Sequence, residues 1–266
     1  MSALASKGTA LITGASTGIG AVYADRLARR GYDLILVARS EEKLSEVAAR
    51  LKANGRSIET MAADLTKKED VQRVAGRLST DATITALVNN AGTASVGKLL
   101  DAKIDELESM ISLNVTALTR LALAALPGFV ARKNGLLINI ASVVALAPEL
   151  LNGTYSGTKA YVVNFTQALK KELEGKGVTV QAVLPGATAT PLWEKAGRPV
   201  EHLPAEIVMT AEDMVDASLA GLDQHELITL PSLPDIADWE KFEAARKALG
   251  PNLSRQKPPA RYGIQG

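Results

Sequence analysis

The sequence predicts an α/β fold: one doubly wound sheet of about seven parallel strands, with helices on both faces. Short runs rich in Val, Ile and Leu alternate with longer segments in which apolar residues recur at helical spacing. That alternation is typical of parallel strands buried on both faces and joined by right-handed helical crossovers. The chain has 266 residues, 47% of them hydrophobic and 22% charged, which suits a single domain of this class. We expect that domain over residues 1–250 and an irregular tail over residues 251–266.

The elements follow in order along the chain. The expected strands are residues 9–13, 33–38, 57–62, 84–88, 136–140, 178–184 and 227–230. Helical periodicity predicts helices over residues 19–30, 41–54, 67–78, 104–133, 155–176 and 211–222. Residues 189–210 contain three prolines and predict a substrate loop with a short helix. Trp239 and Phe242 lie three apart and indicate one more short amphipathic helix.

Composition excludes several classes of function. Thirty Lys and Arg against 29 Asp and Glu give a net charge of +1, which excludes bulk attraction to nucleic acid or an anionic membrane. The absence of cysteine excludes disulfides and thiolate catalysis, and two histidines are too few for most zinc sites, so no metal is expected. No secretory signal and no apolar stretch of about 20 residues is apparent, so we expect a cytoplasmic protein without a membrane span.

The motif TGASTGIG, residues 13–20, lies between the first strand and the first helix. Its glycines let the backbone approach a pyrophosphate, and the helix N-terminus offers free amides and the positive end of a dipole. The expected contacts are Gly14, Ser16, Thr17, Gly18, Ile19 and Gly20. The same stretch also satisfies G-x-S-x-G, the nucleophile elbow of α/β-hydrolases. In that alternative Ser16 is the nucleophile and His202 or His225 the base, but only a dozen residues precede the turn, which leaves no further strand upstream to supply an oxyanion loop.

The second strand ends in LVARS, residues 36–40. An adenine ribose with a free 2′-hydroxyl favours an acidic residue there, but the sequence has Ala38 and Arg39. The planar fork of arginine suits a 2′-phosphate, so Arg39 and Ser40 predict NADP(H) in preference to NAD(H). The alternative is a solvated arginine that opens a helix. After the next two strands, further cofactor contacts are expected from Asp64, Leu65, Asn90, Ala91 and Gly92.

Four polar residues form the candidate chemical site. Tyr155 and Lys159 lie four apart, on one face of a helix, and Ser142 ends the preceding strand, where an open sheet places its ligand. Asn114 lies inside the predicted 104–133 helix, an unfavourable place for an asparagine that has no polar function. Taken singly, these are also consistent with a surface pair and a satisfied buried amide. After the sixth strand, PGATATP offers Pro185, Gly186, Thr188 and Thr190 to a cofactor ring.

Together these motifs, in this order over about residues 8–230, resemble the short-chain dehydrogenases/reductases. The resemblance implies a Rossmann-type domain, a nicotinamide cofactor and hydride transfer to or from a carbonyl or alcohol carbon. It implies a catalytic tetrad of Asn114, Ser142, Tyr155 and Lys159, with Tyr155 as general acid/base and its pKa lowered by Lys159. Tyr155 and Lys159 would also contact the cofactor, and Asn114 would hold a water molecule. LVARS is similar to the NADP-preferring branch, from which Thr17 departs because many members have a basic residue there.

The expected substrate is a small-molecule apolar ketone, aldehyde or alcohol. The residues expected to line its site are mostly apolar: Val143, Val144, Leu146, Leu150, Leu192, Trp193 and Leu203. Two alternatives remain, a 3-oxoacyl thioester reductase and a non-catalytic NADP-binding regulatory protein. Apolar side chains on the 104–133 and 155–176 helices also predict a homotetramer or homodimer. The residues behind that prediction are Leu107, Met110, Leu118, Leu121, Val162, Phe165 and Leu169.

Overall fold

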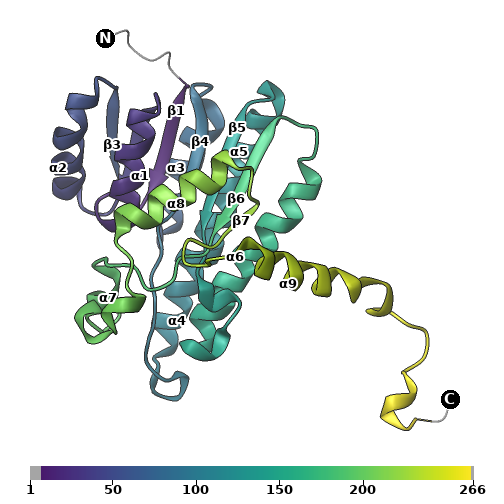
Figure 1. Cartoon of the computed structure of the whole chain (residues 1–266). Coiled ribbons are helices and arrows are strands. Elements are labelled where there is room, and N and C mark those ends of the chain that lie inside the picture. Colours follow the sequence, from purple (N-terminus) through teal and green to yellow (C-terminus); the bar gives the residue numbers. More distant parts are fainter. Residues whose placement is uncertain (1–6, 265–266) are drawn as a thin grey trace. The chain divides into compact units, whose positions relative to one another are not determined.

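The computed structural model describes residues 7–264, and its first compact unit extends to Pro231. A seven-stranded sheet with the order β3-β2-β1-β4-β5-β6-β7 forms the centre of this unit, and every strand pair is parallel (Figure 1). The strands are β1 (Thr9–Thr13), β2 (Asp33–Ala38), β3 (Ile58–Ala62), β4 (Ile84–Asn89), β5 (Gly135–Ile140), β6 (Val178–Val183) and β7 (Ile228–Thr229). The predicted doubly wound α/β fold is confirmed.

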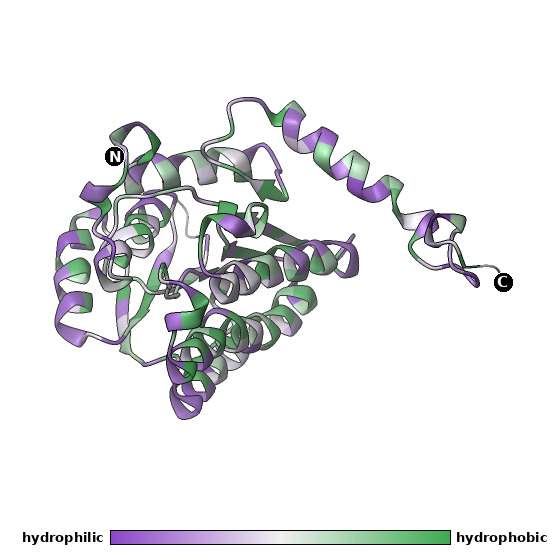
Figure 2. Ribbon diagram, turned by 90° about the horizontal axis from the view of Figure 1, so that it is seen from below, coloured by the Kyte–Doolittle hydropathy of each residue, from purple (hydrophilic) through white to green (hydrophobic). Residues whose placement is uncertain are grey.

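Helices cover both faces of the sheet. One apolar layer packs under α1 (Gly18–Arg29), α2 (Glu41–Leu51) and α8 (Ala211–Asp223). The other packs under α3 (Lys68–Thr80), α5 (Leu118–Arg132) and α6 (Gly153–Glu172). Successive side chains of a strand point to opposite faces of the sheet. Ile12 and Leu36 therefore pack into the first layer, and Leu11 and Ile35 pack into the second. Figure 2 shows the apolar strands in green between helices whose outer faces carry most of the purple.

The predicted 104–133 helix is not one regular helix. It consists of α4 (Ile104–Ile111), a π-helical turn at Ser112–Ala117, and α5. An 18-residue window within Ile104–Arg132 has a mean hydropathy of 1.4, so this segment is long and apolar enough to cross a membrane by length and composition alone, a test that the core helix of a soluble protein also passes. In the structure α5 packs against β4 and β5 as a core helix. The π-turn holds Asn114, and such turns occur often at functional sites.

Seven apolar side chains on the 104–133 and 155–176 segments were the basis for predicting an oligomer, and most of them are buried within a single chain. Of the seven, all except Phe165 are buried, mainly against the sheet or the neighbouring helix. The sequence argument for an interface is therefore wrong about these residues, because a helix that covers a sheet is as apolar as one that meets a partner.

The segment between β6 and α8 forms a closed loop at the carboxyl edge of the sheet. Its two ends are joined because the Ala189 amide donates to the Met209 carbonyl at 2.8 Å and the Met209 amide to the Ala187 carbonyl at 2.9 Å. Inside the loop lie the short helix α7 (Leu192–Lys195) and two 3-10 turns, in agreement with the predicted loop with a short helix.

The second compact unit begins at Ser232, although the sequence analysis placed the end of the domain at residue 250. It contains α9 (Ile236–Ala248), which includes the predicted helix around Trp239 and Phe242, and 3-10 turns at Gly250–Asn252 and Ala260–Tyr262. The two aromatic rings stack with centroids 5.4 Å apart. None of the described residues of this unit is buried.

Candidate active site

The turn after β1 is built so that the backbone comes close to a ligand. Gly14 and Gly18 have φ values of +66° and +53°, in the left-handed region that favours glycine. A Cβ added to Gly20 would lie 2.3 Å from the Gly14 carbonyl oxygen, so no larger residue fits. Thr17 caps α1 without a side-chain hydrogen bond, and the first turn has no acidic residue. The α1 N-terminus is therefore suited to a phosphate group.

Asn90, which the sequence predicted as a cofactor contact, braces this turn from the end of β4. Its Nδ2 donates to the carbonyl oxygens of Thr13 at 2.9 Å and Gly14 at 3.3 Å. The backbone amides of Asn90 and Ala91 both donate to the Thr13 hydroxyl at 3.0 Å. Thr13 is thus a positioning residue that the sequence analysis missed, although it stands directly before the glycine turn.

The amide of Asn114 connects three segments. Its Oδ1 accepts a hydrogen bond from the Thr93 amide at 2.9 Å, and its Nδ2 donates to the Thr93 carbonyl at 2.9 Å and to the Thr158 hydroxyl at 3.1 Å. Thr158 in turn donates to the Tyr155 carbonyl at 2.7 Å. Asn114 therefore anchors the loop after β4 to the helix that bears Tyr155. Thr93 and Thr158 were not predicted from the sequence, and Asn114 was expected to hold a water molecule and not to make these hydrogen bonds.

Ser142, Tyr155 and Lys159 lie together at the carboxyl end of β5, with 8%, 6% and 7% of their surfaces exposed. The Lys159 amine donates to the Ile140 carbonyl at 2.9 Å and lies 5.8 Å from the centroid of the Tyr155 ring. A Cβ on Gly92 would lie 3.6 Å from this amine, so the loop after β4 also approaches it closely. An ammonium has three donors, and Ile140 takes one of them.

Burial shifts both titratable groups of this site. It raises the pKa of Tyr155 to about 12, although a hydrogen bond with Ser142 acts in the opposite direction. Burial also lowers the pKa of Lys159 to about 8. The sequence predicted that Lys159 lowers the pKa of Tyr155, whereas the largest influence on this pKa in the structure is desolvation of the phenolate, which raises it. At neutral pH Tyr155 therefore carries its proton.

The PGATAT segment lies against two parts of the site: the residues that follow β5 and the glycine turn after β1. The Val143 amide donates to the Pro185 carbonyl at 3.0 Å, and a Cβ on Gly18 would lie 3.0 Å from the Thr190 methyl group. The Thr188 hydroxyl donates to the Gly186 carbonyl at 3.2 Å, while Trp193 Nε1 donates to the Thr188 carbonyl at 3.0 Å. Pro185, Gly186 and Thr190 are thus brought to the site, whereas the Thr188 side chain is buried in the segment itself.

The adenine side of the candidate cofactor site follows β2 and β3. Arg39 is exposed, and no hydrogen bond or ion pair joins its side chain to residues 7–264, so it is available to an anion. Ser40 Oγ accepts from the Lys43 amide at 3.3 Å and keeps its hydroxyl proton for another partner. Asp64 Oδ1 accepts from the amide and hydroxyl of Thr66, and Leu65 is buried.

The hydrolase alternative lacks a general base. His202 and His225 are both exposed, and neither forms a hydrogen bond with Ser16 among the described residues. Across residues 7–264, no three His, Asp or Glu side chains gather as a metal site requires.

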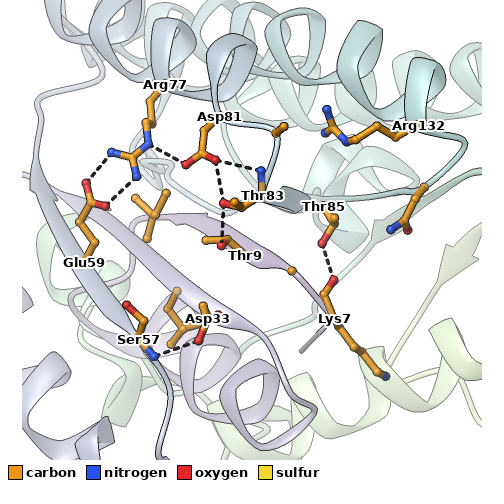
Figure 3. Close-up of a pocket in the computed structure, with 15 residues that line it drawn as sticks. Lys7, Thr9, Asp33, Ser57, Glu59, Arg77, Asp81, Thr83, Thr85 and Arg132 are labelled. Atoms are coloured by element: carbon orange, nitrogen blue, oxygen red, sulfur yellow. Dashed lines mark hydrogen bonds and ion pairs between the residues drawn. The ribbon is translucent and has the colours of Figure 1, made fainter. Parts of the chain in front are cut away.

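A second polar region lies at the opposite, amino edge of the sheet. A depression of about 720 Å³ is lined here by residues at or near the start of β1 to β5. Figure 3 shows these side chains and the hydrogen bonds and ion pairs between them. Here Arg77 makes two 2.8 Å bonds to Glu59 and one 3.0 Å bond to Asp81. These charges are paired with one another, and 37% of the Arg77 side chain and 47% of the Glu59 side chain remain in solvent. The arrangement is that of a stabilising surface network.

Comparison with known proteins gives a consistent result. The family described as short chain dehydrogenase matches residues 8–201. A short-chain dehydrogenase from Sphingobium yanoikuyae in complex with NADPH has a TM-score of 0.92 at 46% identity, covering 95% of this chain and 98% of that chain. A bulky-bulky ketone specific alcohol dehydrogenase from Comamonas testosteroni has a TM-score of 0.88 at 40% identity, covering 96% and 98%.

Two curated relatives have names that specify their substrates. A bovine very-long-chain 3-oxoacyl-CoA reductase is 31% identical over 245 residues, covering 89% of this chain and 78% of that protein. Human 17-beta-hydroxysteroid dehydrogenase type 3 is 35% identical over 215 residues, covering 79% of this chain. The match spans 66% of the human enzyme's own length.

Proposed function

The chain belongs to the short-chain dehydrogenase family, whose enzymes act on CH–OH and C=O groups, and we propose that it is an NADP(H)-dependent ketone reductase and secondary-alcohol dehydrogenase. The observation that carries this proposal is the buried group of Ser142, Tyr155 and Lys159 beside a glycine turn that leaves room for a pyrophosphate.

The residues at the carboxyl edge fit a dinucleotide. When bound there, a nicotinamide would supply or accept the hydride that the substrate carbon gains or loses. Gly14, Gly18 and Gly20 admit the pyrophosphate against the α1 N-terminus, because side chains there would collide with the turn or with Thr190. The two donors that Lys159 does not give to Ile140 bind the nicotinamide ribose hydroxyls.

Tyr155 moves the proton. In the reducing direction its neutral hydroxyl donates to the oxygen that becomes the alcohol, and burial keeps that proton in place at pH 7. The Ser142 hydroxyl donates a hydrogen bond to the same oxygen as negative charge develops. Protonated Lys159 stabilises the resulting phenolate. In the oxidising direction Tyr155 must first lose its proton, so alcohol oxidation increases with pH while ketone reduction does not.

Arg39 selects NADP(H). Its guanidinium, which has no hydrogen bond or ion pair with residues 7–264, directly follows β2, where NAD-specific sites favour a carboxylate, and Ser40 adds a hydroxyl beside it. A planar fork with no internal partner pairs a 2′-phosphate without first breaking another contact.

The substrate is an apolar ketone or the matching secondary alcohol. Tyr155 lies in a small apolar cluster with Leu107, Met110 and Val144, and Leu151 packs against it. Leu146 and Leu150 extend the apolar surface into solvent. The bulky-ketone specificity of the Comamonas relative agrees with such a surface. A second candidate is a 3-oxoacyl thioester reductase, which the bovine relative favours.

A carbonyl panel tests the proposal. Purified protein with NADPH is given bulky aryl ketones, small ketones, aldehydes and 3-oxoacyl thioesters, and loss of reduced cofactor is followed by absorbance. We expect the highest kcat/KM with bulky apolar ketones. A preference for thioesters would establish the second candidate. Binding of NADPH without turnover of any carbonyl would instead identify a regulatory NADP-binding protein. The cytoplasmic location and the homodimer or homotetramer predicted from the sequence remain predictions.

A further inference from the structure

The helix α6, which carries Tyr155 and Lys159, has a weak first turn. It begins at Gly153, and Gly157 follows one turn later, so two glycines flank Tyr155. Glycine destabilises a helix relative to alanine, because it loses more conformational freedom on folding. A Cβ added to either glycine would meet no heavy atom of another described segment within 4 Å, so close packing does not require them. The proposed proton donor therefore lies in a turn that needs support from outside the helix.

Asn152 supplies that support with both ends of its side-chain amide. Its Oδ1 accepts a hydrogen bond from the Thr154 amide at 2.9 Å, so Asn152 is the N-cap of α6. Its Nδ2 donates to the Gly97 carbonyl at 3.1 Å, in the loop that follows β4. Only 5% of Asn152 is exposed, so water competes little for either bond. Asparagine, aspartate and serine cap helices about equally well, so the bond to Gly97 is what an amide adds at this position.

The loop that Asn152 holds lies against the apolar surroundings of Tyr155. It covers residues 93–98, between β4 and a 3-10 turn at Leu99–Asp101. Ala94, near the start of this loop, packs against the apolar cluster that contains Tyr155. The loop has no helix or strand of its own, so its position depends on the side chains that hold it.

Twu side chains hold the loop, one near each end. Asn114 holds Thr93 through two 2.9 Å hydrogen bonds, beside the residues expected to contact the cofactor. Asn152 holds Gly97 at the other end. If only the second attachment is lost, the loop should come away from Tyr155 while its cofactor end stays in place.

We propose that Asn152 is a positioning residue for carbonyl reduction: it joins the loop 93–98 to the first turn of α6 and thereby holds Tyr155 in line with the substrate oxygen. The inference rests on the proposed function, because it gives Asn152 a part in the same proton transfer. Asn152 acts through Tyr155 and not on the reacting atoms. Displacement of a reacting group by about 1 Å can lower a rate about 100-fold, so this one attachment has a measurable effect on turnover.

Two substitutions separate the bond to Gly97 from the helix cap. Asn152→Ser keeps an uncharged N-cap oxygen but is too short to reach Gly97 as well, and Asn152→Asp keeps the cap and the shape but has no donor. We expect both to lower kcat for ketone reduction roughly 10- to 100-fold. The NADPH dissociation constant should stay within about threefold of wild type and the melting temperature within about 2 °C, because the cofactor end and the cap are kept.

The matched controls are Asn134→Ser and Asn134→Asp, which make the same changes at an exposed position at the amino edge and should leave all three values unchanged. A wild-type kcat in Asn152→Ser overturns the proposal even if Asn152→Asp is slow, because the introduced charge would then be the cause. A large fall in melting temperature, loss of folding, or a loss of NADPH affinity that matches the loss of kcat indicates a purely structural role and also overturns it.

Proteolysis tests the attachment without turnover. Lys98 is exposed at the end of the loop, so trypsin should cleave after it more readily once the loop detaches. With NADPH present, we expect cleavage after Lys98 to be at least ~10-fold faster in both Asn152 variants than in wild type, and cleavage after the exposed Lys67 to be unchanged. An unchanged rate at Lys98 overturns the proposal. A wild-type protein that reduces no carbonyl refutes the proposed function instead, and the rate at Lys98 then decides the attachment alone.

Discussion

Both edges of the sheet carry polar side chains, but the ion-paired groups of the amino edge are largely exposed, whereas those of the carboxyl edge are buried. At the amino edge Arg77 pairs with Glu59 and Asp81, and 37% of the Arg77 side chain and 47% of the Glu59 side chain lie in solvent. At the carboxyl edge Tyr155 and Lys159 are almost fully buried, and the only hydrogen bond that the Lys159 side chain makes to residues 7–264 is the one to Ile140. At the amino edge, hydrogen bonds from Thr83 and Arg77 lower the pKa of Asp81 although burial acts in the opposite direction. At the carboxyl edge, burial raises the pKa of Tyr155 and lowers the pKa of Lys159.

The two edges therefore have different roles: the amino edge contributes to stability, and the carboxyl edge holds the groups that can react. Exposed, matched ion pairs stabilise a fold slightly and leave no group free to react. Buried groups with shifted pKa values and spare hydrogen-bonding capacity weaken the fold but can exchange protons. Substitutions at the carboxyl edge should therefore change rate much more than stability, and those at the amino edge should do the reverse.

A large contrast between the change in rate and the change in stability is expected for Ser142→Ala. The hydroxyl supports developing charge on the substrate oxygen, so its loss should lower kcat by roughly 10²- to 10³-fold. The melting temperature should change little, because Ser142 Oγ makes only long 3.4 Å bonds to Pro185 and Val144. Steady-state kinetics with thermal unfolding checks both parts. Unchanged kcat would remove Ser142 from the site.

Lys159→Met should make the protein inactive and, at neutral pH, more stable. The folded pKa of Lys159 is about 8 and its ordinary value 10.5, so the cost of burying the cation is absent above pH 10.5 and complete below pH 8. The stability gap between variant and wild type should thus shrink by about 3 kcal/mol as pH rises from 7 to 10.5. Denaturant unfolding at several pH values measures it. A gap that does not depend on pH contradicts the assigned burial of the charge.

Arg39→Ala should reduce the NADPH preference by roughly 10- to 100-fold, since one charge-assisted pairing contributes about 1.5–3 kcal/mol. The readout is kcat/KM for NADPH and NADH on one ketone at fixed salt. Arg50→Ala, another exposed arginine, is the control and should leave the ratio unchanged. Equal loss with both cofactors would mean that Arg39 does not contact the 2′-phosphate.

Arg77→Met should give the smallest effect. It removes two exposed ion pairs, so the free energy of unfolding should fall by roughly 1 kcal/mol. Turnover with NADPH should stay at the wild-type value, because the change lies at the amino edge. A large loss of kcat would mean that the depression in Figure 3 takes part in the reaction.

The sequence predicted the strands well, because a strand buried on both faces is a continuous apolar run, as in Ile35 and Leu36. It did not predict the π-turn, since one extra residue per turn over Ser112–Ala117 barely changes helical spacing. It named Asn114 but not its clamp, because Thr158 lies 44 residues away in the chain. The direction of the Tyr155 pKa shift depends on how tightly Leu107, Met110 and Val144 enclose the ring, which spacing does not reveal.

The proton-donor role of Tyr155 is the central claim, and Tyr155→Phe tests it with the loss of a single oxygen atom. The measurement is kcat for ketone reduction at pH 7, together with NADPH affinity from fluorescence titration. Removal of the general acid should lower kcat by at least ~100-fold while NADPH affinity stays within a factor of about three. A variant that binds NADPH normally and reduces the ketone at the wild-type rate would contradict the account.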